Sequence, residues 1–117
     1  MPYLPILRRL LESVDGALGA GFVDYDGETV QLVGQFEEYA HRVHLACQGI
    51  FLDRVKAVHQ RHLDPPSSLL CVYQGYTLII KPLNNGYFLA LTLAHRKALS
   101  KAFRAVEDAA MRLNLDL

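Results

Sequence analysis

The sequence predicts an α+β fold, a single five-stranded antiparallel sheet with helices on both faces and the element order αββαβββα. Apolar residues recur at helical spacing near both ends and in the middle of the chain. Five strand-like runs lie between these segments, and short turn signals join them in the way antiparallel neighbours are joined. With 117 residues, 51% of them apolar, the chain has the size of one domain with one core, so residues 1–117 are expected to form a single domain.

The chain opens with an amphipathic helix and a hairpin. Apolar side chains recur three and four residues apart, and Gly16 follows where a helix can end. These side chains are Leu4, Leu7, Leu11 and Val14. Residues 18–25 and 28–33 then flank Asp26-Gly27, a dipeptide suited to the positive φ angles of a two-residue hairpin turn.

Residues 35–62 predict one long helix with apolar side chains on two nearly opposite sides. The stripe expected to face the core consists of Phe36, Ala40, Val43, Cys47, Ile50, Phe51 and Val58. Leu45 and Leu52 lie roughly 180 to 200° from Val43 on a helical wheel. Either they are scattered exposed leucines, which are common on surfaces, or they form an interface; the second interpretation is favoured.

Residues 64–67, Asp-Pro-Pro-Ser, end this helix because proline lacks a backbone donor and restricts the residue before it. The runs 68–73, 76–83 and 87–94 follow, separated by short turns, and predict an antiparallel meander. Residues 87–94 are apolar almost without interruption, as expected of a central strand covered on both faces.

Residues 95–114 predict a final helix that packs on the sheet. Its apolar face contains Leu99, Ala102, Phe103, Val106, Ala110 and Leu113. On the other face, Asp108 is spaced to form i,i+4 ion pairs with both Arg104 and Arg112.

Twelve basic and twelve acidic side chains cancel, so no global field favours nucleic acid or a membrane surface as a partner. No apolar run approaches the ~20 residues of a membrane span, and the N-terminus lacks the pattern of a signal peptide. Both cysteines, Cys47 and Cys71, occupy core-like positions. A reduced, cytoplasmic setting is therefore expected.

The sequence offers little catalytic apparatus. The spacing of Gly16, Gly19 and Gly21 is not that of a dinucleotide fingerprint; these glycines are expected to end the first helix and let it lie close to the sheet. Two i,i+3 histidine pairs, at 41/44 and 59/62, lack a convergent third metal ligand. No serine stands in a nucleophile elbow. The chain is expected not to be an enzyme and to need no cofactor or metal.

The stretch 14–28, Val-Asp-Gly-Ala-Leu-Gly-Ala-Gly-Phe-Val-Asp-Tyr-Asp-Gly-Glu, and the meander followed by an amphipathic helix resemble the Roadblock/dynein-light-chain family, including its bacterial gliding-motility members. The resemblance covers nearly the whole chain, although the helix at 35–62 is longer than the family's second helix. It implies a homodimer that binds and regulates a small Ras-like GTPase, and it makes stimulated GTP hydrolysis an expectation. A purely structural adaptor and a profilin-like ligand sensor are the alternatives.

In such dimers the long helices pack side by side and an edge strand of each sheet pairs across the two-fold axis. Here the pairing edge is expected at residues 68–74, which carry few of the charges that protect an exposed edge. The expected dimer interface comprises His41, Leu45, Gln48, Leu52, His59, Leu70 and Val72. Arg42 and Arg54 are the candidate contacts to a partner. Arg54 either snorkels from the core side of the helix or faces that partner.

Overall fold

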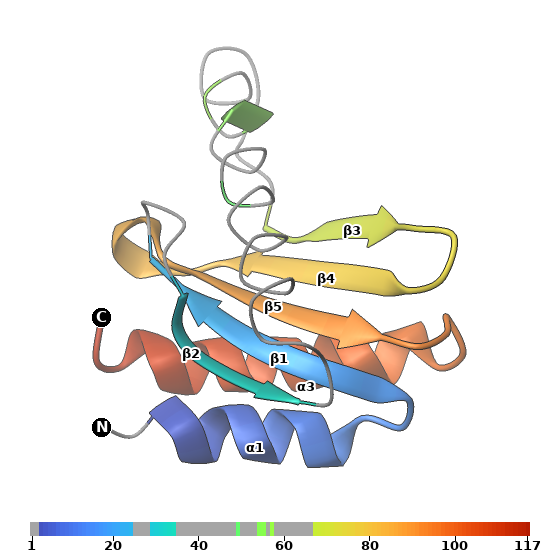
Figure 1. Cartoon of the computed structure of the whole chain (residues 1–117). Coiled ribbons are helices and arrows are strands. Elements are labelled where there is room, and N and C mark those ends of the chain that lie inside the picture. Colours follow the sequence, from blue (N-terminus) through green and yellow to red (C-terminus); the bar gives the residue numbers. More distant parts are fainter. Residues whose placement is uncertain (1–2, 25–28, 35–48, 50–53, 56, 58–66) are drawn as a thin grey trace.

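The computed structural model describes residues 3–24, 29–34, 49, 54–55, 57 and 67–117 (Figure 1). Their elements are α1 (Tyr3–Ser13), β1 (Ala17–Val23), β2 (Thr29–Gly34), β3 (Leu69–Val72), β4 (Thr77–Pro82), η1 (Asn84–Gly86), β5 (Phe88–Leu93) and α3 (Leu99–Asn114). The strands form one five-stranded sheet in the order β2-β1-β5-β4-β3, and every neighbouring pair is antiparallel. This confirms the predicted α+β class, the N-terminal hairpin and the meander.

The predicted long helix is described at only a few positions. Gly49, Arg54, Val55 and Ala57 are helical. The remainder of residues 35–62 lies outside the described residues, and so do the predicted core stripe and the hairpin turn at Asp26-Gly27. The helix expected on the second face of the sheet therefore stays a prediction.

Helices α1 and α3 lie side by side on one face of the sheet (Figure 1). α1 packs on β1 and β2, while α3 packs on β4 and β5. Between them and the sheet lies the larger core cluster, in which Phe22 stacks on Tyr87 with ring centroids 5.3 Å apart. The fully buried members of this cluster include Leu7, Phe22, Ile79, Leu89, Leu91 and Leu113.

A second apolar cluster lies on the opposite face of the sheet. It contains Val23, Leu78, Ile80, Phe88 and Ala90, each at most 2% exposed. Because side chains alternate along a strand, these residues come from positions between those of the first cluster. All six residues of β5 are buried and β5 lies in the middle of the sheet, which confirms the prediction for residues 87–94.

Three details differ from the sequence expectations. In α1 the buried residues are Tyr3, Leu7 and Leu10, followed by Val14 after the helix, whereas Leu4 and Leu11 are half-buried. Leu7 and Val14 belong to both the predicted and the observed face, so the face that packs is rotated by roughly 50°, about half the step between neighbouring residues. Leu4 and Leu11 instead border a groove beside β2.

The second difference is the start of α3. The helix begins at Leu99 and not at His95, because Ala98 has a left-handed backbone with φ 57°. The backbone N–H of Lys97 donates to Nδ1 of His95 at 3.3 Å, which holds a turn before the helix. The chain needs this turn because it must leave the sheet before it can run back over the face.

The third concerns the glycines. Gly16 has φ 82° and lies in the turn that follows α1, close to where the sequence predicts the end of this helix. Ala20 and Phe22, however, belong to the cluster beneath α1. By strand alternation Gly19 and Gly21 face the other side of the sheet, so they do not let α1 approach it. None of the described helices is long and apolar enough to cross a membrane.

Candidate interaction surface

Strand β3 forms one edge of the sheet and presents two apolar side chains to solvent. It pairs with β4 alone among the described strands. Leu70 is 41% exposed and Val72 is 51% exposed, although both are large apolar residues. Their neighbours Leu69 and Cys71 pack against the second cluster, so Leu70 and Val72 lie on the face that carries α1 and α3.

The exposure of Leu70 and Val72 follows from where α3 lies. α3 packs on β4 and β5, one strand short of the edge (Figure 1). Leu70 is paired with Ile79, which is fully buried, so the boundary between covered and uncovered sheet falls between these two neighbouring strands. The uncovered part of the sheet is apolar.

The two edges of the sheet are not equivalent. At the β2 edge, α1 packs against the strand, and Arg8 and Glu12 of α1 line the groove between them. At the β3 edge, the strand reads Leu-Leu-Cys-Val and contains no charge and no proline. Charged side chains and prolines are the usual means of preventing strand addition at an edge. The sequence of β3 thus leaves this edge open to pairing.

A tyrosine pair bounds the β3 edge. Tyr73 and Tyr76 flank the turn at Gln74 and Gly75, with their rings stacked at a centroid distance of 4.8 Å. The backbone N–H of Tyr73 donates to the carbonyl of Tyr76 at 2.9 Å, which closes the turn. Sequence reasoning had identified the turn but not the pair; aromatic residues at both ends of a two-residue turn are the signal that predicts it.

Cys71 is half-buried within β3. Burial raises the pKa of its thiol above the ordinary value of 9.0, because desolvation disfavours the thiolate. At neutral pH the side chain therefore behaves as a small apolar group and not as a nucleophile. This matches the core-like role expected for Cys71.

The structure places three of the nine predicted interface and contact residues. Leu70 and Val72 lie two residues apart on one side of β3, and Arg54 is helical and exposed. Exposure of Arg54 fits both a snorkelling side chain and one that faces a partner, so its role stays a prediction. His41, Arg42, Leu45, Gln48, Leu52 and His59 lie outside the described residues, so their approach to the β3 edge stays a prediction.

Other chemistry is sparse in the described part of the chain. No group of three or more His, Cys, Asp or Glu residues there is placed to hold a metal ion. The hydroxyl of Ser13 donates to the carbonyl of Leu10 at 3.0 Å and so satisfies a backbone acceptor at the end of α1.

Of the two ion pairs predicted on α3, the one between Arg112 and Asp108 forms, with Nε and Oδ2 3.2 Å apart. Among the described residues, no ion pair joins Arg104 to Asp108.

Comparison with known proteins places the fold. No protein-family model and no curated protein sequence matches the chain. Among solved structures it is similar to Myxococcus xanthus MglB, with a TM-score of 0.87 and 12% identity over 97% of this chain and 93% of that one. It is also similar to a Roadblock/LC7 domain from Streptomyces avermitilis, with a TM-score of 0.78 and 14% identity over 92% and 91% of the two chains.

A third similarity is to profilin II of Acanthamoeba castellanii, with a TM-score of 0.65 and 13% identity over 94% of each chain. The lower score shows that the architecture of this chain is less similar to that profilin than to MglB or the Roadblock/LC7 domain. At identities of 12 to 14% these similarities establish architecture. The chain has the α+β fold of the Roadblock/LC7 domain and of MglB.

Proposed function

We propose that the chain is a homodimeric interaction module that binds and regulates a small Ras-like GTPase. The observation that carries the proposal is the uncharged edge strand β3, with Leu70 and Val72 exposed beside it. An open, apolar edge invites a second strand, and the commonest closed assembly is a two-fold dimer. The MglB-like fold supports the same expectation, since the Roadblock resemblance implies a dimer of this kind.

Two copies joined at β3 would form one continuous sheet. Each copy would bring Leu70 and Val72 to the two-fold axis, so that apolar side chains exposed in the single chain meet across it. The predicted second face of residues 35–62, with Leu45 and Leu52, would pack alongside on the other side of the sheet. Such a dimer is a wide platform built from secondary structure, the kind of surface that recognises a partner by shape and a few anchors.

If the module stimulates GTP hydrolysis, it does so by ordering the switch loops of the GTPase. The chain is neutral overall, so steering by a strong field does not explain partner choice. An activator can select a competent conformation of its partner without supplying a catalytic arginine. The module itself is then not an enzyme.

The binding step is tested by capturing small GTPases from the native host with the chain as bait, followed by titration with the purified GTPase loaded with GDP or with a GTP analogue. The proposal expects one host GTPase to bind, with a preference between the two nucleotide states. Capture of other proteins without any GTPase would favour the structural adaptor.

The ordering mechanism is tested by replacing arginines one at a time with alanine. Arg54 and Arg96 are exposed; Arg42 and Arg61 complete the set. Each variant is expected to weaken binding at most and to leave the turnover rate at saturation near that of the wild type. A loss of ~10³-fold in that rate from one substitution, the size expected of an arginine finger, would contradict the mechanism.

A further inference from the structure

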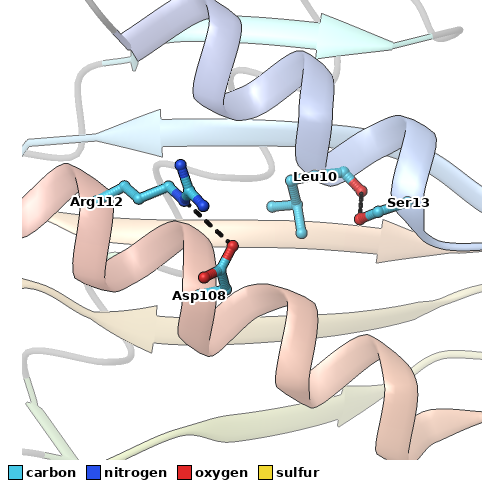
Figure 2. Close-up of polar contacts among 4 residues, drawn as sticks. All are labelled: Leu10, Ser13, Asp108 and Arg112. Atoms are coloured by element: carbon cyan, nitrogen blue, oxygen red, sulfur yellow. Dashed lines mark hydrogen bonds and ion pairs between the residues drawn. The ribbon is translucent and has the colours of Figure 1, made fainter.

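A groove of about 270 Å³ lies between α1 and α3, away from the β3 edge. Its aliphatic lining comes from both helices and consists of Ile6, Leu10, Ala105 and Ala109. Leu10 and Ala109 are almost completely buried members of the larger core cluster, so the groove opens directly over the core. Figure 2 shows α1 and α3 here, with Leu10 and Ser13 on one helix and Asp108 and Arg112 on the other.

Three arginines line this α1–α3 groove: Arg9 from α1, and Arg104 and Arg112 from α3. Asp108 is the one carboxylate among the lining residues, and its Oδ2 accepts from Nε of Arg112 at 3.2 Å. Within the described residues, no ion pair involves Arg9 or Arg104. Three positive charges against one negative charge leave the groove with a surplus of two positive charges, although the whole chain is neutral.

We propose that the α1–α3 groove binds an acidic peptide segment of a partner protein, in which carboxylates stand on either side of an apolar side chain. Guanidinium groups offer paired donors that match a carboxylate, and here both helices contribute them together with the aliphatic lining. The apolar side chain of the peptide would lie on Ile6 and Ala105, which are half-buried in the free chain. This inference is independent of dimerisation and of any GTPase.

Two other occupants fit the groove less well. A free inorganic anion would use the arginines but leave the aliphatic lining uncovered. A membrane surface is also a poor match, because helices that bind bilayers project their apolar side chains into the lipid. Here Leu10 and Ala109 are recessed among arginines, at 2% and 4% exposure.

The test uses the full chain and a short fluorescein-labelled peptide centred on Glu-Leu-Glu. The proposal expects saturable binding that weakens as salt is raised, with amide NMR shifts confined to α1 and α3. A Gln-Leu-Gln peptide is expected to bind at least about tenfold more weakly, because its side chains cannot form charge-assisted bonds. Failure of the Glu-Leu-Glu peptide to bind at low salt would overturn the proposal.

Charge-matched variants show whether peptide affinity depends on the arginines that line the groove or only on the total positive charge of the two helices. Arg9→Gln with Arg104→Gln is expected to weaken binding about tenfold or more. Arg8→Gln with Lys101→Gln removes the same charge from the same two helices, at exposed residues that do not line the groove. This control pair is expected to change affinity by about twofold at most. Equal losses in the two pairs would overturn the proposal.

Asp108→Asn is a variant for which tighter peptide binding is expected, a result that a partly unfolded protein would not give. Removing this carboxylate releases Arg112 and raises the positive surplus, so the Glu-Leu-Glu peptide is expected to bind more tightly. Unchanged or weaker binding in this variant would count against the groove. If inorganic phosphate displaced the peptide at a concentration similar to that of the peptide, the groove would be a simple anion site. If phosphatidylserine vesicles bound in an arginine-dependent way and the peptide did not bind, the groove would be a membrane contact. Either result would overturn the proposal.

Discussion

Gly16 lies directly against the imidazole ring of His95: a Cβ atom added to Gly16 would stand 2.7 Å from Cε1 of His95. The carbonyl of Gly16 also accepts the N–H of Ala94 at 2.8 Å, so the turn after α1 and the turn before α3 are joined. Because Gly16 has φ 82°, both the backbone and the space at this position require glycine.

Gly16→Ala is therefore expected to lower the free energy of unfolding by about 2 kcal/mol or more, from a left-handed backbone and a contact with His95. Urea denaturation measures this loss. Gly75→Ala is the matched control, because a Cβ there meets nothing within 4 Å. Adding His95→Ala to Gly16→Ala should recover the stability lost through contact with the imidazole ring. It should not recover the stability lost because alanine disfavours a left-handed backbone. A Gly16→Ala variant as stable as Gly75→Ala would contradict this account.

Thr92 carries a buried hydroxyl in the central strand. Its Oγ1 has no hydrogen-bond partner among the described residues, and the side chain is only 5% exposed. Thr92→Val keeps the shape and removes the unsatisfied group, so it should raise the free energy of unfolding by about 1 kcal/mol. Thr92→Ser keeps the hydroxyl and loses the methyl group, so it should be destabilising. A destabilised valine variant would mean that the hydroxyl is satisfied in solution.

The half-buried thiol of Cys71 is expected to lower the free energy of unfolding in alkaline solution. Burial raises the pKa of its thiol in the folded chain above the 9.0 of an exposed thiol. Well below pH 9.0 the thiol is protonated in both the folded and the unfolded chain, so Cys71 does not make the free energy of unfolding depend on pH. As the pH rises above 9.0 the unfolded chain loses the proton first, which favours unfolding.

Cys71→Ala should accordingly reduce the slope of stability against pH above this point, whatever its effect at neutral pH. Urea denaturation of the wild type and of Cys71→Ala, each at neutral and alkaline pH, separates the effect of the substitution at neutral pH from its effect on the slope. The titrations of tyrosine and lysine do not interfere, because both proteins contain the same tyrosines and lysines. A slope identical to that of the wild type would show that the thiol ionises equally in the two states.

Local patterns predicted most of the described architecture. The almost continuous apolar run at residues 87–94 predicted the central strand β5, and short turns between apolar runs predicted the antiparallel order. The errors come from long-range packing. Which of Leu10 and Leu11 is buried depends on how α1 is rotated on the sheet, and the delayed start of α3 depends on the turn at Ala98, where the chain leaves the sheet. Neither relationship is visible in a window of neighbouring residues.

The candidate surfaces divide in the same way. The uncharged edge at Leu70 and Val72 was predictable because strand pattern and charge are local properties. The α1–α3 groove was not, because Arg9 and Arg104 are far apart in sequence and only the packed helices bring them together. The spacing of Arg104 and Asp108 even indicated an ion pair, yet Asp108 pairs with Arg112 and leaves Arg104 available.

The claim that β3 is a pairing edge is tested most directly by the mass of the chain in solution. Light scattering across a range of concentrations is expected to show a dimer for the wild type. Leu70→Lys with Val72→Lys should give a folded monomer, because two copies would bring like charges together at the axis. The control, Met111→Lys with Leu115→Lys, alters two side chains that are 69% and 85% exposed at the end of α3 and should remain dimeric. A wild type that stays monomeric at high concentration, or a β3 double variant that stays dimeric, would contradict the account.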